Sequence, residues 1–357
     1  MELNNIIFSF LLPIFVFLIS KYLLHVFNSK KINILNDDEF NKPQAFHENS
    51  TFRLGGLIIF LSLSVVFLYL FLSNKYYFPE YISFSILFFF LGFFDDLKID
   101  IKPKLRLLIM ITFLLFLIIF HEFKIERISL EYLDHLMKID IFALFFVCLC
   151  FLFIINGSNL IDGFNGLLGL HSLIIFTILF LINLTNENNN LAYIQFYLIL
   201  LTLIFLKFNF PKAQVFFGDS GAYLTGALIA VSVIKTSIFN PSISPFFFCI
   251  LLFYLFFEVF FSFFRKLFFV RLSPLLPDAQ HLHMLLYKYF LKKGKTKLNS
   301  NYNVSVYLNL IYFLLIIPGI ILMDKGLFCR YYFFFLLIVY LIFYKILYSI
   351  MKKNNIV

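Results

Sequence analysis

The stretch FALFFVCLCFLFIINGSNLIDGFNGLLGLHSLIIFTILFLINL, residues 142–184, places two long apolar runs on either side of an amide-rich turn. Each run suffices to cross about 30 Å of hydrocarbon, which takes about 20 helical residues. The turn from Asn156 to Gly166 is rich in glycine. Irregular polar backbone at membrane depth is tolerated only where protein or a water-filled cavity satisfies it. The stretch therefore predicts two membrane helices that meet at a hydrated turn.

The apolar pattern extends over the whole chain. Hydrophobic residues make up 62% and charged residues 14%, whereas soluble domains have roughly 45–50% and 25%. Eleven apolar runs are centred near Val16, Leu63, Leu87, Leu114, Phe146, Ile175, Leu200, Ile229, Tyr254, Leu314 and Leu337. We expect an all-α integral membrane protein that forms a single domain over residues 1–357, with about 11 transmembrane helices around a hydrated catalytic cavity.

The basic residues predict the orientation of the chain. Most of the 29 Lys and Arg residues fall in the loops after the odd-numbered runs, and cytoplasmic loops collect such residues. This pattern predicts an outer N-terminus, an inner C-terminus and a cytoplasmic position for four polar patches. The net charge of +9 is then a topology signal, and we expect no nucleic-acid partner.

The first patch is the adjacent pair Asp95 and Asp96 at the end of the third run, followed by Lys98. Adjacent carboxylates repel each other, and hard oxygen ligands of this kind suit Mg²⁺. A polar helix end that faces water is the alternative.

In the second patch, Asn156, Asn159, Asp162 and Asn165 recur every third residue. This spacing drifts around an α-helix by about 60° per step, so it favours a broken or tightly wound turn. Amides and a carboxylate together suit a uracil edge, a sugar or a metal-bound phosphate. A purely structural turn is the alternative.

The third patch is Gly218-Asp219-Ser220-Gly221. Flexible glycine backbone can approach a metal or an oxyanion closely, and Asp219 is a candidate metal ligand. The alternative is a helix start that Asp219 or Ser220 caps.

The fourth patch contains His281 and His283, after Pro277 and Asp278. As cations or donors, the two imidazoles suit a diphosphate. Zinc is the weaker hypothesis because no further Cys or His cluster accompanies them. Two surface histidines without a role are the other alternative. Arg53, before Gly55-Gly56, either binds phosphate or anchors a helix at the headgroups.

The order of these motifs resembles the polyprenyl-phosphate N-acetylhexosamine-1-phosphate transferases of glycosyl transferase family 4. The resemblance covers residues 46–285. It rests on His47-x-x-x-Thr51-x-Arg53-x-Gly55-Gly56, Asp95-Asp96 with Pro103 and Arg106, Asn156-x-x-Asn159-x-x-Asp162-Gly163-x-Asn165, Phe216-x-Gly218-Asp219 and Pro277-Asp278-x-x-His281-x-His283.

The resemblance implies a multi-pass enzyme of the bacterial inner membrane that starts a cell-envelope glycan, O-antigen being one candidate. It transfers HexNAc 1-phosphate from a UDP-sugar to polyprenyl (undecaprenyl) phosphate with Mg²⁺ or Mn²⁺, and releases UMP; a homodimer is left open. The implied catalytic residues are Asp95, Asp96, Asp162, His281 and His283, and the metal ligand is Asp219. The implied substrate-binding residues are Arg53, Lys98, Asn156, Asn159, Asn165, Asn209 and Phe216, the last two at positions of uridine contacts.

The chain lacks the run of three histidines that is usual in the peptidoglycan branch of the family, so UDP-GlcNAc or a derivative is the expected donor. Met284 stands where relatives commonly have a further histidine. A secondary transporter is the rival from another class. Transporters place their carboxylates near the bilayer midplane and show paired repeats, whereas here the patches share one side.

Overall fold

The structure, a computed structural model, describes residues 3–29, 34–37, 50–73, 77–99, 101–270, 273 and 278–352. His47 and Pro277 lie outside these ranges. The described part is largely helical. Its elements are α1 (Leu3–Ser29), β1 (Asn36–Asp37), β2 (Thr51–Phe52), α2 (Gly55–Leu72), α3 (Pro79–Asp96), α4 (Pro103–Phe120), α5 (Glu131–Leu136), α6 (Asp140–Ile161), α7 (Leu167–Thr185), α8 (Asn189–Asn209), α9 (Gly218–Phe239), α10 (Pro245–Leu251), α11 (Phe253–Phe264), the π-helix η1 (Arg265–Val270), α12 (Leu282–Lys292), α13 (Lys297–Ile321) and α14 (Gly326–Lys352).

Within the described ranges, nine helices are long and apolar enough to cross a membrane, and the bent pair α10–α11 makes a tenth candidate. The predicted membrane-spanning helical fold is confirmed, but the count is below the expected eleven. The difference lies at α3, which corresponds to the run centred near Leu87. This helix has 18 residues, but it carries Glu80 near its start and Asp95 and Asp96 at its end.

The span centred near Tyr254 is broken. Helices α10 and α11 meet at Leu252 with a bend of 76°. The backbone then continues into the π-helix η1, which begins at Arg265. Sharp bends of this kind place irregular backbone at membrane depth, which requires protein around it. After the break, Glu258 of α11 accepts a hydrogen bond from the first backbone N–H of α12.

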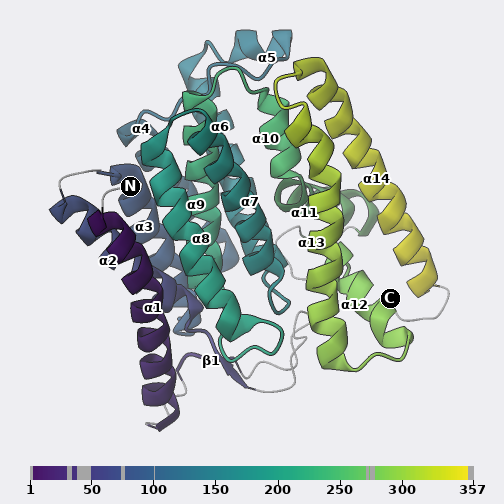
Figure 1. Ribbon diagram of the computed structural model, residues 1–357. Helices are drawn as coiled ribbons and strands as arrows, with labels where there is room; N and C mark the ends of the chain where they lie inside the picture. The colour runs from purple at the N-terminus through teal and green to yellow at the C-terminus, as the bar shows by residue number, and fades with distance from the viewer. Residues whose placement is uncertain are drawn as a thin grey trace.

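Helix α9 forms the core of the bundle and packs against α2, α3, α6 and α7. Most of its residues are buried, and Figure 1 shows it enclosed by the other helices. Small side chains allow this close packing. A Cβ atom at Gly226, for example, would lie 2.8 Å from the Cα of Ile155 in α6.

Two short strands position the segment before α2. Asn36 pairs with Phe52 and Asp37 with Thr51 in an antiparallel register. Phe52 also bridges Val215 in parallel, and the backbone N–H of Phe216 donates to the carbonyl of Phe52 over 2.8 Å. This pairing joins the α1–α2 connection to the segment that leads into α9.

The two ends of the described chain lie on the left and right sides of the bundle in Figure 1. Helix α1 begins at the left of Figure 1 and runs downward, and α14 ends at the right, beside α12. The orientation of the two termini across the membrane stays a prediction. The strand β1 lies at the lower side of Figure 1, and the segment that leads into α9 joins it there through β2.

Candidate functional site

The contacts of the structure bring the four polar patches together. Asp96 at the end of α3 reaches the start of α9, and Asn159 of α6 reaches Tyr223 of α9 over 3.2 Å. The turn after α6 meets the fourth patch through Phe164, whose ring centroid lies 5.7 Å from that of His283. One region at the lower face therefore contains side chains from residues far apart in the sequence.

Asp96 is fully buried and caps the N-terminus of α9. Its carboxylate accepts hydrogen bonds from the backbone N–H groups of Asp219 and Ser220, both over 2.9 Å, and from the Ser220 hydroxyl over 2.6 Å. A carboxylate is favourable here because the first N–H groups of a helix lack partners within it. The alternative in which Asp219 or Ser220 itself caps the helix is wrong, because Asp96 does so from another helix.

Glycines hold the backbone of the third patch against its neighbours. A Cβ atom at Gly92 of α3 would lie 2.4 Å from the carbonyl carbon of Asp219. Gly218 has φ of +70°, and a Cβ atom there would lie 2.6 Å from an Asp96 carboxylate oxygen. The positive φ and the close approach both require glycine at this position. The position of Asp219 is therefore fixed by backbone contacts.

Asp95 points to a different partner. Its carboxylate accepts a hydrogen bond from Arg106 of α4 over 2.7 Å. The Arg106 guanidinium lies 5.9 Å from the ring centroid of Tyr223, whose hydroxyl accepts the bond from Asn159. The two adjacent carboxylates of the first patch thus have different partners: Asp96 binds the start of α9, and Asp95 binds Arg106 of α4.

Arg53 brings positive charge to the acidic residues. One guanidinium nitrogen lies 3.1 Å from Asp37 and another lies 3.9 Å from Asp96. Burial alone would lower the pKa of Arg53, but the charges of Asp37, Asp219 and Asp96 raise it above its ordinary value. Arg53 is therefore a permanent cation beside the start of α9, not only a headgroup anchor.

Asp162 directly follows α6. Burial raises its pKa well above the ordinary value, and the negative charges of Asp219 and Asp96 raise it further. A divalent cation would relieve this repulsion, and carboxylate oxygens are the ligands that Mg²⁺ prefers. Among the described residues, no three His, Cys, Asp or Glu side chains form a metal cage. One or two carboxylates with substrate phosphates and water are the usual Mg²⁺ environment, so Asp219 and Asp162 fit this ion.

The amides expected at the nucleotide have partners within the protein. Asn209 accepts a bond from the Gly166 N–H over 2.6 Å and donates to the carbonyl of Val215 over 2.8 Å. Asn165 donates to the carbonyl of Pro211 over 2.9 Å, and Asn156 donates to Leu152 within its own helix. Asn209 uses both ends of its amide, so its placement does not support the expected uridine contact and instead shapes the turn before α7.

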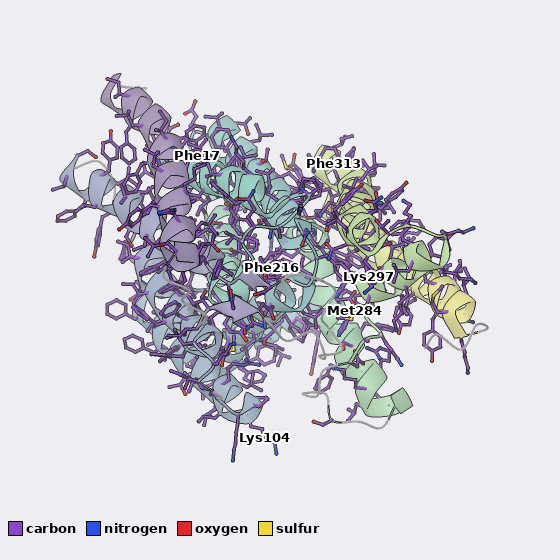
Figure 2. All side chains as sticks on the ribbon, turned by 90° about the horizontal axis from the view of Figure 1, so that it is seen from below. Phe17, Lys104, Phe216, Met284, Lys297 and Phe313 are labelled. Carbon is purple, nitrogen blue, oxygen red and sulfur yellow. The ribbon has the colours of Figure 1, made fainter. Side chains whose placement is uncertain are left out.

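Two other expected substrate contacts lie nearer the surface. Lys98 is exposed in the turn after α3, with φ of 60°. Phe216 is half-buried, and its carbonyl accepts a bond from the Gly55 N–H over 2.9 Å. Figure 2 places Phe216 near the middle of the lower face and Lys104 at its edge. An aromatic ring at this place suits a planar base.

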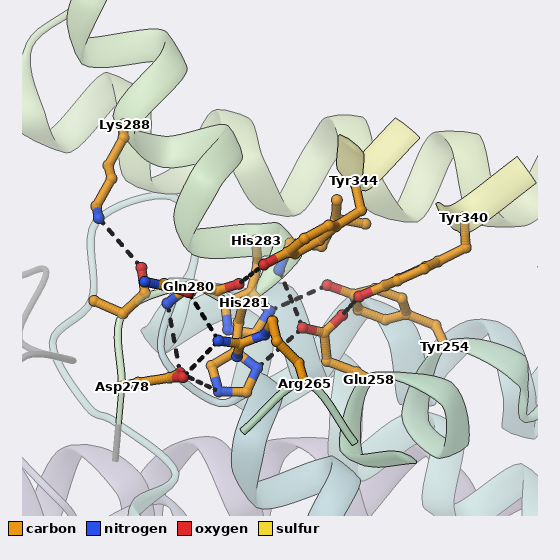
Figure 3. Close-up of polar contacts among 12 residues, drawn as sticks. Tyr254, Glu258, Arg265, Asp278, Gln280, His281, His283, Lys288, Tyr340 and Tyr344 are labelled. Carbon is orange, nitrogen blue, oxygen red and sulfur yellow. Dashed lines mark hydrogen bonds and ion pairs between the residues drawn. The ribbon is translucent and has the colours of Figure 1, made fainter. Parts of the chain in front are cut away.

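His281 and His283 are both fully buried, so the hypothesis of two idle surface histidines is wrong. His281 precedes α12 in extended conformation and His283 lies in its first turn; their rings stack with centroids 5.4 Å apart. Nδ1 of His281 lies 3.0 Å from Glu258 and Nδ1 of His283 lies 3.1 Å from the Tyr254 hydroxyl (Figure 3). Burial lowers the pKa of His283 to about 3, which keeps its ring neutral.

The sequence reasoning missed several members of this region. Glu258 and Tyr340 are embedded in apolar runs, and Tyr223 sits among small residues of α9. Arg106 was noted as part of a motif but received no role. A lone glutamate inside a span was the signal that could have revealed Glu258, because charges in spans are costly and generally functional. Met284 is buried in α12, away from solvent.

Comparison with known proteins identifies a family and several relatives. The model of Glycosyl transferase family 4 matches residues 78–237. The chain is similar to phospho-N-acetylmuramoyl-pentapeptide-transferase of Dictyoglomus turgidum, with 36% identity over 238 residues, 64% of this chain and 73% of that protein.

A second group of relatives has a different name. Undecaprenyl-phosphate alpha-N-acetylglucosaminyl 1-phosphate transferase of Thermotoga maritima is 28% identical over 330 residues, which cover 92% of each chain. The protein of the same name from Escherichia coli K12 is 24% identical over 270 residues, 72% of this chain and 70% of that protein.

Proposed function

The chain belongs to glycosyl transferase family 4 and is a multi-pass membrane phospho-N-acetylhexosamine-1-phosphate transferase of class EC 2.7.8, and from this premise we propose that its donor is UDP-GlcNAc. The acceptor is polyprenyl phosphate, and the products are polyprenyl-diphosphate-GlcNAc and UMP. The transporter hypothesis is wrong, because membership of this family makes the chain a transferase.

Two observations support GlcNAc over the muramoyl-pentapeptide donor. The similarity to the Thermotoga maritima N-acetylglucosaminyl 1-phosphate transferase extends over 92% of both chains. The fourth patch reads His281-Leu282-His283-Met284 and has no consecutive histidines. The similarity to the muramoyl-pentapeptide transferase has the higher identity but covers 64% of this chain. The full-length similarity is the observation that carries the proposal.

The reaction exchanges one phosphoanhydride for another. An oxygen of the lipid phosphate attacks the sugar-proximal phosphorus of the UDP-sugar. The bond from that phosphorus to the bridging oxygen breaks, and UMP leaves with the electron pair. Little driving force is needed, so catalysis consists of positioning and charge neutralisation. The second pKa of a phosphate monoester is near 6, so the attacking lipid phosphate is already largely ionised at neutral pH.

Different site residues supply the charge neutralisation and the positioning. Asp219 and Asp162 would hold Mg²⁺, or Mn²⁺ as the alternative ion, which when bound neutralises charge on the diphosphate and on UMP. Arg53 adds a permanent positive charge beside them. Asp95 is engaged by Arg106, so it orients groups near the lipid phosphate and is not needed as a base. Phe216 stacks on uracil, while Asn159 and the turn to Asn165 line the nucleotide.

We assign the histidines a role other than direct contact with the diphosphate. Both rings are buried, and both ring nitrogens of His281 face carboxylates. Among the described residues, Nε and Nη2 of neighbouring Arg265 are buried without a hydrogen-bond partner. We assign the contact with the substrate anion on this side to Arg265, which the histidine segment holds in place.

Purified protein with undecaprenyl phosphate and Mg²⁺ tests the proposal. UDP-GlcNAc and UDP-MurNAc-pentapeptide are supplied in parallel, and UMP and the lipid product are measured. We expect product from UDP-GlcNAc, and its loss when EDTA removes the metal. Product from the muramoyl-pentapeptide donor alone would refute the proposed sugar, and no UMP from any UDP-HexNAc would refute the proposed reaction.

A further inference from the structure

Glu258 is a buried carboxylate inside a predominantly aromatic span. It lies in α11, between Phe257 and Val259, and is 1% exposed. An acidic side chain in a membrane helix costs free energy unless partners satisfy it, and its presence generally has a functional reason. The transfer chemistry proposed for the acidic patches does not use this residue.

Each oxygen of Glu258 has a partner from another part of the chain. Oε1 accepts bonds from Nδ1 of His281 and from the backbone N–H of Leu282, both over 3.0 Å. Oε2 accepts a bond from the Tyr340 hydroxyl over 2.5 Å. Figure 3 shows Glu258 between the histidines and Tyr340 of α14. We call the hydrogen-bonded group of Glu258, His281 and Tyr340 the Glu258 brace.

The brace constrains His281 at both nitrogens. A carboxylate only accepts hydrogen bonds, so Nδ1 must carry a hydrogen toward Glu258. Nε2 lies 3.3 Å from Oδ1 of Asp278. A hydrogen on each ring nitrogen would satisfy both carboxylates, so the geometry places His281 between two anions. Such pairing is what allows charges to be buried.

The constraint extends to Arg265. Asp278 lies 2.8 Å from Nη1 of Arg265, and Gln280 accepts a bond from the same nitrogen over 2.9 Å. Burial alone would raise the pKa of Asp278, but the bond from Arg265 and the charge of His281 lower it below its ordinary value. The four charges of Glu258, His281, Asp278 and Arg265 balance one another.

The other histidine receives a neutral partner. Tyr254 lies one helical turn before Glu258 in α11, so the two side chains share a face. Its hydroxyl pairs with Nδ1 of His283. Helix α11 thus presents a phenol to one imidazole and a carboxylate to the other.

We propose that Glu258 is a positioning residue: it holds His281 doubly protonated and, through His281 and Asp278, fixes the Arg265 guanidinium for the substrate anion. This inference rests on the proposed function for its kinetic readout. It also makes α14 part of the site, because Tyr340 secures the second oxygen of Glu258.

Four variants in the full-length protein test the proposal. Glu258→Ala removes the brace, and Glu258→Gln keeps its shape but removes its charge. Tyr340→Phe keeps the carboxylate and removes one donor, so it stays informative if the alanine variant does not fold. Tyr332→Phe is the matched control, because this α14 tyrosine donates to the carbonyl of Leu315 and does not contact the brace.

Kinetics and amide exchange give the first readouts. We expect kcat of Glu258→Ala to fall about 10- to 100-fold, as when a partner that orients a functional imidazole is lost. Tyr340→Phe falls a few-fold, and Tyr332→Phe stays at the wild-type value. Amide hydrogen exchange rises in residues 278–285 alone. A wild-type kcat in Glu258→Ala, or an equal rise in exchange throughout the bundle, would overturn the proposal.

Protonation is read independently of activity by ¹⁵N-histidine NMR. The His281 signals are identified by their loss in His281→Asn. We expect two protonated ring nitrogens in the wild type and one in Glu258→Gln. A neutral His281 in the wild type would overturn the proposal. If no donor yields UMP, the proposed reaction fails, whereas the exchange and NMR results still decide the role of Glu258.

Discussion

Asp96 and Glu258 are both buried, but different kinds of hydrogen-bond donor satisfy the two carboxylates. Each is a buried carboxylate that caps the first turn of a helix from another helix, α9 for Asp96 and α12 for Glu258. Asp96 meets backbone N–H groups and a serine directly, with Gly92 and Gly218 allowing close approach. Glu258 is held largely by side chains: it accepts hydrogen bonds from the imidazole of His281 and the phenol of Tyr340. Backbone contacts fix a position, whereas side-chain contacts also set a protonation state.

The largest effect is expected at Asp219, the residue that the first arrangement positions. In Asp219→Asn the charge is lost but the shape is kept, so we expect turnover to fall by about 10²- to 10³-fold or more, as for other lost electrostatic groups. UMP release measures the change. Asp324→Asn, at an exposed residue before α14, is the control. Near-normal turnover in Asp219→Asn would exclude Asp219 as the metal ligand.

Gly92→Ala breaks the close approach between α3 and α9. The added Cβ atom would lie 2.4 Å from the Asp219 backbone, and overpacking of this kind costs about 1–3 kcal/mol. We expect a lower melting temperature in detergent and a loss of turnover of about tenfold or more. Gly326→Ala is the control, since its nearest neighbour would lie at 3.8 Å. Equal stability of the two variants would show that α3 can move away from α9.

The same carboxylate-to-amide change can be made in both capping residues, Asp96 and Glu258. In Asp96→Asn the new NH₂ group meets backbone donors that cannot accept, which leaves buried groups unsatisfied at about 1–3 kcal/mol. In Glu258→Gln the NH₂ group faces the Tyr340 hydroxyl, which can rotate and accept. We therefore expect Asp96→Asn to lower the melting temperature more than Glu258→Gln. The reverse order would show that charge, not hydrogen bonding, dominates both sites.

Ser220→Ala is expected to have the smallest effect. It removes one of the three bonds to Asp96 and leaves both backbone donors in place, a change of about 0.5–1.5 kcal/mol. Thermal unfolding checks this value, and turnover should fall by less than tenfold. A loss as large as that of Asp219→Asn would mean that the hydroxyl itself contacts substrate or metal.

The membrane fold follows from local sequence more readily than the tasks of single residues. The apolar runs predicted the helices because a span requires only length and hydrophobicity. The bend at Leu252 could not be predicted from the apolar runs. The sequence is apolar on both sides of the break and has no proline or glycine there. The run centred near Leu87 was predicted as a span, but α3, with acidic residues at both ends, is not among the nine candidate spans of the described residues.

Tertiary contacts decided the roles inside the site. Asp95 and Asp96 are adjacent in sequence, but neighbouring helical positions point about 100° apart, so one carboxylate faces Arg106 and the other faces α9. Asn209 matched a position of expected uridine contact, yet the turn before α7 uses its amide. Glu258 is a single charged residue in a long apolar run, and one charge barely changes the mean hydropathy of such a run. Composition therefore does not reveal it.

The cap on α9 has a consequence for how the chain is made. Asp96 and Ser220 are separated by 124 residues, so α4 to α8 are synthesised before the partners of Asp96 leave the ribosome. During that interval the acidic end of α3 relies on water at the membrane surface. The polar centre can therefore close only after α9 has been inserted, and a chain halted before Gly218 holds the first patch without the backbone that secures it.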